Sequence, residues 1–238
     1  MSTEHWRLEA ENWVRWARTA GHDAYWDYRK SFFDIVPDPG RRTIEIGCGE
    51  GRIARDLESR GHHVIGIDAS HTMIRYACMA DAGGTYTVAD AAFLPFEDAG
   101  FDLAVAYNSL MDIDDMPAAV AEAARVLEPG GHLCISVTHP INDAGAFANE
   151  DPDASFTIRG SYLEVRTLDE TIKRSGLEMR FRSKCYPLER YWRAFEAAGL
   201  IVESLREPAA PAQAVARAPS EIRWQRVPMF LQLRLSKP

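Results

Sequence analysis

The stretch that decides the fold of this chain reads Thr43-Ile44-Glu45-Ile46-Gly47-Cys48-Gly49-Glu50-Gly51-Arg52. The alternation of apolar and polar residues over 42–46 predicts a short buried strand, and the pattern that starts at Arg52 predicts a helix directly after the turn. Glycines at every second position let the main chain turn tightly and let a ligand lie against bare backbone. The stretch therefore predicts a nucleotide-type cofactor site at the carboxyl end of a first strand.

Strand and helix patterns alternate after this turn. The predicted helices cover residues 52–60, 70–79, 115–127 and 188–198, and the predicted strands cover residues 63–67, 85–89, 101–106, 133–137, 200–204 and 226–235. A repeated strand–helix order predicts a parallel sheet with helices on both faces.

Two segments depart from this order. Residues 2–35 are helical in pattern, rich in aromatic residues and broken at Gly21-His22. Residues 139–186 contain two alternating stretches, 161–166 and 178–184, which predict an inserted antiparallel β cap. We therefore expect a single domain. Its predicted parts are a helical lid (1–40), a cofactor-binding core (41–138), an inserted cap (139–186) and a completion of the core (187–238).

Composition excludes several classes of protein. The net charge of −8 and the pI of about 5.4 disfavour a partner with a phosphate backbone, so no nucleic acid is expected. No apolar run approaches the ~18 residues of a membrane span, and residues 1–20 lack the apolar region of a signal peptide. The cysteines show no metal-ligand spacing, which predicts reduced thiols, no metal site and a cytoplasmic protein.

Three acidic residues line up with the ends of three predicted strands. Glu45 belongs to the glycine-turn stretch at the end of the first, Asp68 follows the second and Asp90 follows the third. A carboxylate at the tip of the second strand commonly accepts hydrogen bonds from ribose hydroxyls, which would suit NAD as well. The dinucleotide fingerprint, however, requires glycine where this chain has Arg52.

Further passages resemble the class I S-adenosylmethionine (SAM) methyltransferases. The glycine turn is similar to motif I of that family, and the match extends over about residues 41–138. The passages are Asp90-Ala91-Ala92-Phe93-Leu94-Pro95-Phe96, Phe101-Asp102-Leu103-Ala104-Val105-Ala106 and Arg125-Val126-Leu127-Glu128-Pro129-Gly130-Gly131. The resemblance implies a Rossmann-like α/β fold, with a mainly parallel seven-stranded sheet and an antiparallel last strand. It also implies SAM as the cofactor and methyl transfer to an oxygen, nitrogen or carbon atom of a small organic acceptor.

The resemblance also assigns roles to residues. Glu45 is expected to help hold water or the amine near the methionine part of SAM, Asp68 to bind the ribose, and Asp90 to accept from the adenine amine. Ala69 is small, so the adenine ring is expected to pack on Met73 or Phe93. The full set of expected cofactor contacts is Glu45, Gly47, Cys48, Gly49, Gly51, Arg52, Asp68, Ala69, Ser70, Met73, Asp90, Ala91, Ala92, Tyr107 and Asn108.

The absence of one motif narrows the class of acceptor. Tyr107-Asn108-Ser109-Leu110 stands where the amino-methylating enzymes of DNA and RNA carry Asn/Asp-Pro-Pro-Tyr/Phe, which disfavours those enzymes. Two rival functions stay open. One is a SAM-binding enzyme that does not methylate, such as a cyclase or decarboxylase on the same fold. The other is a dinucleotide-dependent oxidoreductase, against which Arg52 and Asp90 speak.

Two residues are candidates for a catalytic base. His139 follows the predicted fifth strand and titrates near neutral pH, so it could take a proton from a hydroxyl or amine. The alternative is that it only bonds loop backbone or shapes the pocket. Asp112 is the second candidate, and its alternative is a charge at a helix N-terminus.

Aromatic residues outside the core motifs are candidates for acceptor binding. We expect Trp13, Trp16 and Phe32 to pack in the core. The expected acceptor contacts are Tyr25, Trp26 and Tyr28 from the lid and Tyr162, Tyr186 and Trp192 from the cap side. The alternative for the cap-side residues is that they only pack the insert. The oligomeric state is expected to be monomer or homodimer.

Overall fold

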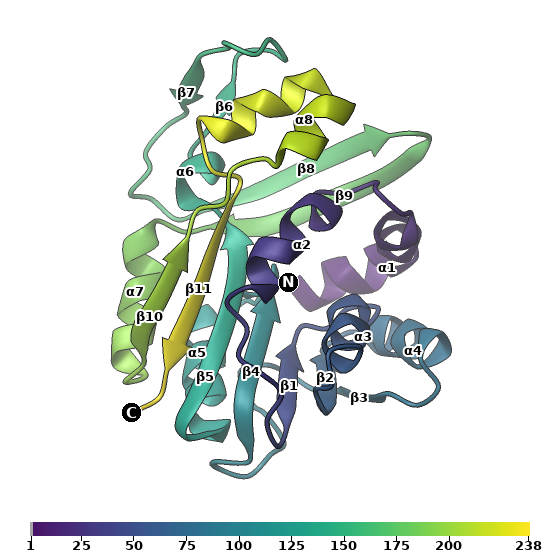
Figure 1. Cartoon of the computed structure of the whole chain (residues 1–238), viewed down its shortest axis with the longest axis vertical. Coiled ribbons are helices and arrows are strands. Elements are labelled where there is room, and N and C mark those ends of the chain that lie inside the picture. Colours follow the sequence, from purple (N-terminus) through teal and green to yellow (C-terminus); the bar gives the residue numbers. More distant parts are fainter. Residues whose placement is uncertain (1) are drawn as a thin grey trace.

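The computed structural model describes residues 2–238 and contains a seven-stranded sheet in the order β10-β11-β5-β4-β1-β2-β3 (Figure 1). The strands are β1 (Thr43–Ile46), β2 (Val64–Asp68), β3 (Thr85–Val88), β4 (Phe101–Tyr107), β5 (Leu127–Thr138), β10 (Ile201–Arg206) and β11 (Phe230–Ser236). Only β11 runs against its neighbours, β5 and β10. The predicted α/β fold, mainly parallel with an antiparallel last strand, is confirmed.

Helices cover both faces of this sheet. They are α2 (Tyr25–Phe33), α3 (Arg52–Glu58), α4 (His71–Ala80), α5 (Met116–Val126) and α7 (Leu188–Ala197). The N-terminal helix α1 (Ser2–Arg18) packs beside α4. One buried cluster joins the sheet to α2 and α3, and a second joins the other face to α5 and α7. No helix among residues 2–238 has both the length and the apolar content that crossing a bilayer would require.

Side chains define where the helices nearest the site begin. The Ser70 hydroxyl accepts from the Met73 amide (3.4 Å) and caps α4, while Asp115 accepts from the Ala118 amide (3.1 Å) and caps α5. Each cap satisfies an amide that the first helical turn leaves without a partner. The loops before these helices are therefore fixed at the carboxyl ends of β2 and β4.

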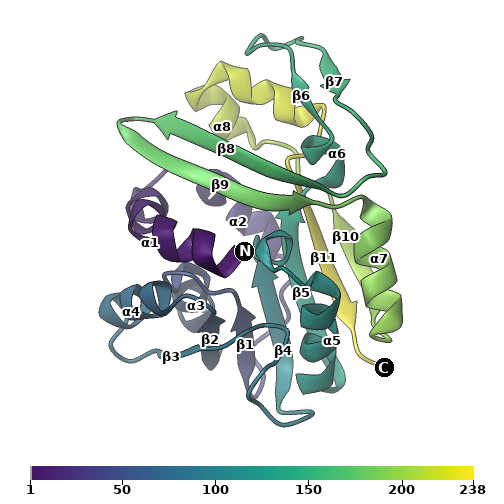
Figure 2. The ribbon, with the colours of Figure 1, turned by 180° about the vertical axis from the view of Figure 1, so that it is seen from behind.

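The segment after β5 adds elements beyond those ends. They are α6 (Pro140–Asp143), β6 (Gly145–Phe147), β7 (Phe156–Ile158), β8 (Arg166–Arg174) and β9 (Leu177–Cys185), followed late in the chain by α8 (Ala212–Arg217) and the 3-10 helix η2 (Pro219–Gln225). The β8–β9 hairpin crosses above the carboxyl ends of the strands, with α1 lying along it (Figures 1 and 2). The rings of Trp16 on α1 and Phe181 on β9 meet edge to face at 5.7 Å.

Three of the expected segments differ from the structure in their element type or in the residue at which the element starts. The strand expected over residues 161–166 starts only at Arg166, because the Ser161 hydroxyl accepts from the Leu163 amide (3.2 Å) and forms a local turn. The segment between the expected strands 200–204 and 226–235, for which we expect no regular element, contains the alanine-rich α8. The strand expected from residue 226 starts at Phe230, after Pro228, which has no amide hydrogen to donate to a sheet.

Candidate active site

The glycine turn between β1 and α3 is held by the neighbouring strand. The amides of Gly47 and Cys48 both donate to the Ile67 carbonyl at 2.8 Å. Gly47, Gly49 and Gly51 have φ values of 73°, 54° and 81°, the left-handed region that glycine adopts without strain. A Cβ on Gly47 would lie 2.5 Å from the Ser109 Cβ, so this position also requires glycine for space.

Asp68 is held at the end of β2 by two backbone amides. Its Oδ2 accepts from the Gly49 amide (2.9 Å) and its Oδ1 from the Ser70 amide (2.8 Å). Burial raises the pKa of this carboxyl, although both hydrogen bonds favour the charged form. The carboxylate therefore ties the glycine turn to the start of α4 and lies at the wall of a cavity.

That cavity has a volume of about 960 Å³ and lies at the carboxyl ends of the strands, bounded by α1, α2, the β8–β9 hairpin and η2. A single drug-sized ligand occupies a pocket of about 300–1,000 Å³, so this space, at the top of that range, is large enough for a ligand of cofactor size. Fourteen of the fifteen expected cofactor residues line it. The exception is Gly51, whose added Cβ would lie 2.9 Å from the Tyr86 hydroxyl oxygen, on the packed side of the turn.

Glu45 is a buried acid on the cavity wall. It is 2% exposed, and its Oε2 has no hydrogen-bond partner among the described residues. Burial, with the nearby charges of Asp68 and Glu50, holds the pKa of its carboxyl well above the usual range. A buried acceptor without a partner is costly in free energy, so a bound group that donates to it would relieve that cost.

The residues after β3 form the other side of the cofactor region. Asp90 is exposed at the cavity wall, and its Oδ1 accepts from the Ala92 amide (2.9 Å). Both residues expected to contact adenine line the cavity. Met73 is 2% exposed, whereas Phe93 is 79% exposed. Met73 is therefore already packed in place, and Phe93 projects into open space.

Tyr107 and Asn108 close the cofactor region at the end of β4. The Tyr107 hydroxyl is buried without a hydrogen-bond partner among the described residues. Asn108 has φ 51°, and its Oδ1 accepts from the Ser136 hydroxyl (2.8 Å), which anchors this strained position to β5. Both residues line the cavity, as the sequence predicts for cofactor contacts.

The expected acceptor contacts separate into two groups. Tyr25 and Tyr28 line the cavity, but Trp26, Tyr162, Tyr186 and Trp192 do not. The Tyr162 hydroxyl accepts from the Leu188 amide (3.1 Å) at the start of α7. Tyr186 and Trp192 pack on rings of α7, Tyr191 and Phe195, so the predicted binding role of the cap-side aromatics lacks a contact with this cavity.

Several aromatic and polar residues that we did not assign to the acceptor line the cavity. Trp13 and Trp16, which we expected in the core, line the cavity, whereas Phe32 is fully buried in the core as expected. On β9, Phe181, Ser183 and Cys185 point the same way, because alternate residues of a strand share a face. The period-two pattern of this strand was visible in the sequence, but it did not show which face meets the cavity.

His139 does not line the cavity. Its Nδ1 accepts from the Ile141 amide (3.1 Å) and caps α6, and its Nε2 lies 2.8 Å from Glu207 Oε1. Burial lowers the pKa of the ring, although Glu207 acts in the opposite direction. Both ring nitrogens thus have partners within the fold, which matches the backbone-bonding alternative; a catalytic role stays a prediction.

Asp112 lines the cavity on the short 3-10 helix η1 (Leu110–Asp112). Its Oδ1 accepts from the Ser183 hydroxyl at 2.5 Å. Burial raises the pKa of the Asp112 carboxyl to about 7, with further increments from the charges of Asp68 and Asp143. A carboxylate with a pKa near neutral pH is suited to accept a proton under ordinary conditions.

Asp143 provides a second acid in the same region. Its Oδ2 accepts from the Thr138 hydroxyl (3.0 Å), and burial raises the pKa of its carboxyl to about 6. Sequence reasoning missed Asp143, because it belongs to the insert rather than to a core motif. No cluster of three or more metal-ligating side chains occurs among the described residues.

Comparisons with known proteins agree with this geometry. Residues 44–135 match the family model described as a methyltransferase domain. The chain is 36% identical over 180 residues to 27-O-demethylrifamycin SV methyltransferase from Amycolatopsis mediterranei, a match that covers 66% of each chain. Its structure resembles that of a SAM-dependent methyltransferase from Mesorhizobium loti, with a TM-score of 0.71, 25% identity and coverage of 90% of this chain and 98% of the other.

Other relatives are matched over a shorter length. O-methyltransferase resE from Aspergillus sclerotiorum is 38% identical over 104 residues, which are 41% of this chain. The chain spans 39% of the length of that relative and less than half the length of several others. The protein belongs to the class I SAM-dependent methyltransferases, and the cofactor of this family is SAM.

The residues present fit this cofactor. Gly49 presents bare backbone at the cavity wall, and an added Cβ there would come into contact with the Trp13 ring nitrogen at 3.4 Å. Glu45 offers a buried acceptor without a partner, and Asp68 and Asp90 offer further carboxylates on the same wall. These groups complement an amine, ribose hydroxyls and an adenine amine, all of which are hydrogen-bond donors.

Proposed function

We propose that the protein transfers the methyl group of SAM to a hydroxyl oxygen of a small organic acceptor. The observation that carries the proposal is the single cavity, which joins the expected cofactor residues to Asp112, a carboxylate with a pKa of about 7. The relatives whose names describe them as O-methyltransferases favour oxygen over nitrogen or carbon as the methylated atom.

The chemistry divides between the bound group and the chain. Bound SAM supplies a methyl group attached to a positively charged sulfur. The chain aligns the acceptor and excludes water, since the aromatic walls at Trp13, Trp16 and Phe181 cover the cavity. Asp112 accepts the hydroxyl proton, and the Ser183 hydroxyl, which donates to Asp112 Oδ1, orients the carboxylate.

The kind of acceptor follows from the net charge of the chain and from the size of the cavity. A small molecule fits a space of this volume, and the net charge of −8 opposes a nucleic-acid acceptor. A cytoplasmic location and a monomeric or dimeric state remain part of this proposal.

Reaction products test the proposal directly. The full chain, incubated with SAM and a panel of small hydroxylated compounds, should form S-adenosylhomocysteine in a one-to-one ratio with an O-methylated product. Asp112→Asn should lower turnover by about 10²-fold or more, the usual scale for the loss of a general base, while the affinity for S-adenosylhomocysteine changes little. Conversion of an acceptor without S-adenosylhomocysteine would support the non-methylating alternative instead.

A further inference from the structure

The cavity is strongly acidic. Among the described residues, thirteen aspartates and glutamates line it, against four arginines and no lysine. Two of the arginines are already paired, Arg52 with Asp23 at 2.9 Å and Arg217 with Asp27 at 2.6 Å. A cleft lined by one sign of charge raises the local concentration of ligands of the opposite sign. The excess of acid exceeds what the three cofactor carboxylates account for.

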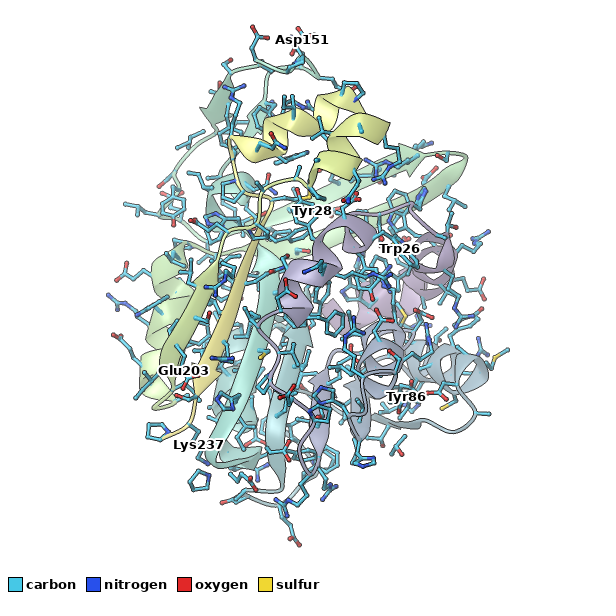
Figure 3. The ribbon with its side chains drawn as sticks, viewed as in Figure 1. Trp26, Tyr28, Tyr86, Asp151, Glu203 and Lys237 are labelled. Atoms are coloured by element: carbon cyan, nitrogen blue, oxygen red, sulfur yellow. The ribbon has the colours of Figure 1, made fainter. Side chains whose placement is uncertain are left out.

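One part of the cavity combines this charge with aromatic rings. Tyr28 on α2, Trp224 on η2 and Phe230 on β11 pack in one apolar cluster, and the rings of Tyr28 and Phe230 meet at 5.1 Å. All three residues line the cavity, as does Glu221 on η2. In Figure 3, Tyr28 lies on α2 where this helix faces α8 and η2.

Tyr28 points to a ligand at this place. The residue is 2% exposed, and its hydroxyl has no hydrogen-bond partner among residues 4–238. Burial raises the pKa of the hydroxyl, and the charges of Glu221 and Asp27 raise it further. Glu221 lines the same cavity and forms no ion pair within the described part of the chain. An unpartnered hydroxyl and an unpaired carboxylate therefore line one aromatic part of the cavity.

The nearby arginines do not supply a counter-charge to this part of the cavity. Arg217 is bound to Asp27. Arg223 donates to the Ser220 carbonyl at 2.9 Å and to the Asn149 carbonyl, and its guanidinium lies 5.4 Å from the centre of the Phe147 ring. Their donors are therefore already directed at groups of the protein, whereas Glu221 is left to face the cavity.

We propose that the acceptor is an amine-bearing small molecule whose ammonium group binds in the subsite formed by Tyr28, Trp224, Phe230 and Glu221. Aromatic faces attract a cation through the ring quadrupole, and the carboxylate supplies a charge-assisted hydrogen bond. The unpartnered Tyr28 hydroxyl accepts a second ammonium proton. The inference rests on the proposed function, because it describes the molecule that receives the methyl group.

Three phenols of similar size and different charge test this subsite. Tyramine carries an ammonium, 4-ethylphenol is neutral, and 3-(4-hydroxyphenyl)propionate carries a carboxylate. Binding is measured by calorimetry on the full chain saturated with S-adenosylhomocysteine. Tyramine should bind about tenfold or more tightly than 4-ethylphenol, the effect of one desolvated cation contact, and the carboxylate should bind most weakly.

Two variants and a control locate the preference. Glu221→Gln and Trp224→Leu should each reduce the advantage of tyramine over 4-ethylphenol to threefold or less. Glu97→Gln, which removes an exposed carboxylate that does not line the cavity, should leave the advantage unchanged. The thermal midpoint of each variant with S-adenosylhomocysteine shows that it is folded and binds the cofactor product.

Defined results would overturn the inference. These are a ranking in which the carboxylate binds as tightly as tyramine, or an advantage of tyramine that survives both subsite variants. Because these measurements need no turnover, they stand apart from the proposed function. That function fails separately if no acceptor yields S-adenosylhomocysteine while tyramine still binds.

Discussion

Gly49→Ala should separate two requirements on the glycine turn. One is a backbone conformation that glycine adopts without cost, and the other is space for the cofactor beside the main chain. Gly49 has φ 54°, where a residue with a Cβ costs about 1–2 kcal/mol of folding free energy. Its added Cβ would have ordinary contact with the Trp13 ring nitrogen at 3.4 Å, so Gly49→Ala creates no severe clash within the protein. The methyl group would occupy the space that we assign to the cofactor.

Gly199 provides a matched control. Its φ is 70°, and a Cβ there would meet no atom within 4 Å. Gly199→Ala therefore carries the same backbone cost without touching the cavity. Each variant should lower the thermal midpoint by about 2–8 °C, because about 1 kcal/mol corresponds to about 2–4 °C for a domain of this size.

Ligand-induced stabilisation distinguishes the two variants. S-adenosylhomocysteine at 100 times its Kd should stabilise the wild type and Gly199→Ala by about 2.7 kcal/mol. Gly49→Ala should lose most of this gain in a thermal-shift titration, and Gly49→Val should lose all of it. Normal affinity in Gly49→Ala would refute the assignment of this turn to the cofactor.

Three further predictions concern the cavity and its walls. Asp68→Ala should weaken S-adenosylhomocysteine binding by about tenfold or more in calorimetry, because charge-assisted bonds worth about 1.5–3 kcal/mol each are lost; an unchanged Kd would exclude a role in binding. Turnover should rise with pH through about 7 as Asp112 loses its proton, and Asp112→Asn should abolish this rise. If His139→Ala abolishes the rise instead, the histidine is the base. Tyr162→Phe should lower stability by about 0.5–1.5 kcal/mol through the lost bond to the Leu188 amide, while the KM for the acceptor stays unchanged; a raised KM would return Tyr162 to the acceptor site.

The cofactor half of the cavity could be predicted from the sequence because its parts are local. Gly47, Gly49 and Asp68 lie at the ends of strands that are neighbours in the sheet, and parallel strands bring their carboxyl ends to one edge. Once the strand–helix order was recognised, the topology placed these residues together. Only Gly51 departed, since it serves the packing against Tyr86.

The acceptor half could not be predicted in the same way. Asp112, Asp143 and Ser183 come from three separate segments, and only the docking of the β8–β9 hairpin brings Ser183 to Asp112. The aromatic pattern of the cap left both acceptor binding and packing open, and the contacts in the structure are of the packing kind: Tyr162 bonds to the start of α7, and Tyr186 and Trp192 pack on rings of α7. Trp16 illustrates the converse. It is as buried as a core residue, yet it lines the cavity and its ring meets that of Phe181 edge to face.

The two parts of the cavity should differ in which amino-acid substitutions they tolerate. The expected cofactor contacts depend on backbone conformations and on amides that bond to Asp68, so we expect most substitutions there to alter both the fold and the binding of SAM. The proposed acceptor space is lined by side chains from α2, η1, α6, β9 and η2. Changing Glu221 or Trp224 alters the charge and shape of the acceptor space while the glycine turn stays intact. The acceptor should therefore be the property of this protein that substitutions change most readily, and the subsite around Tyr28 is where a change of acceptor charge should begin.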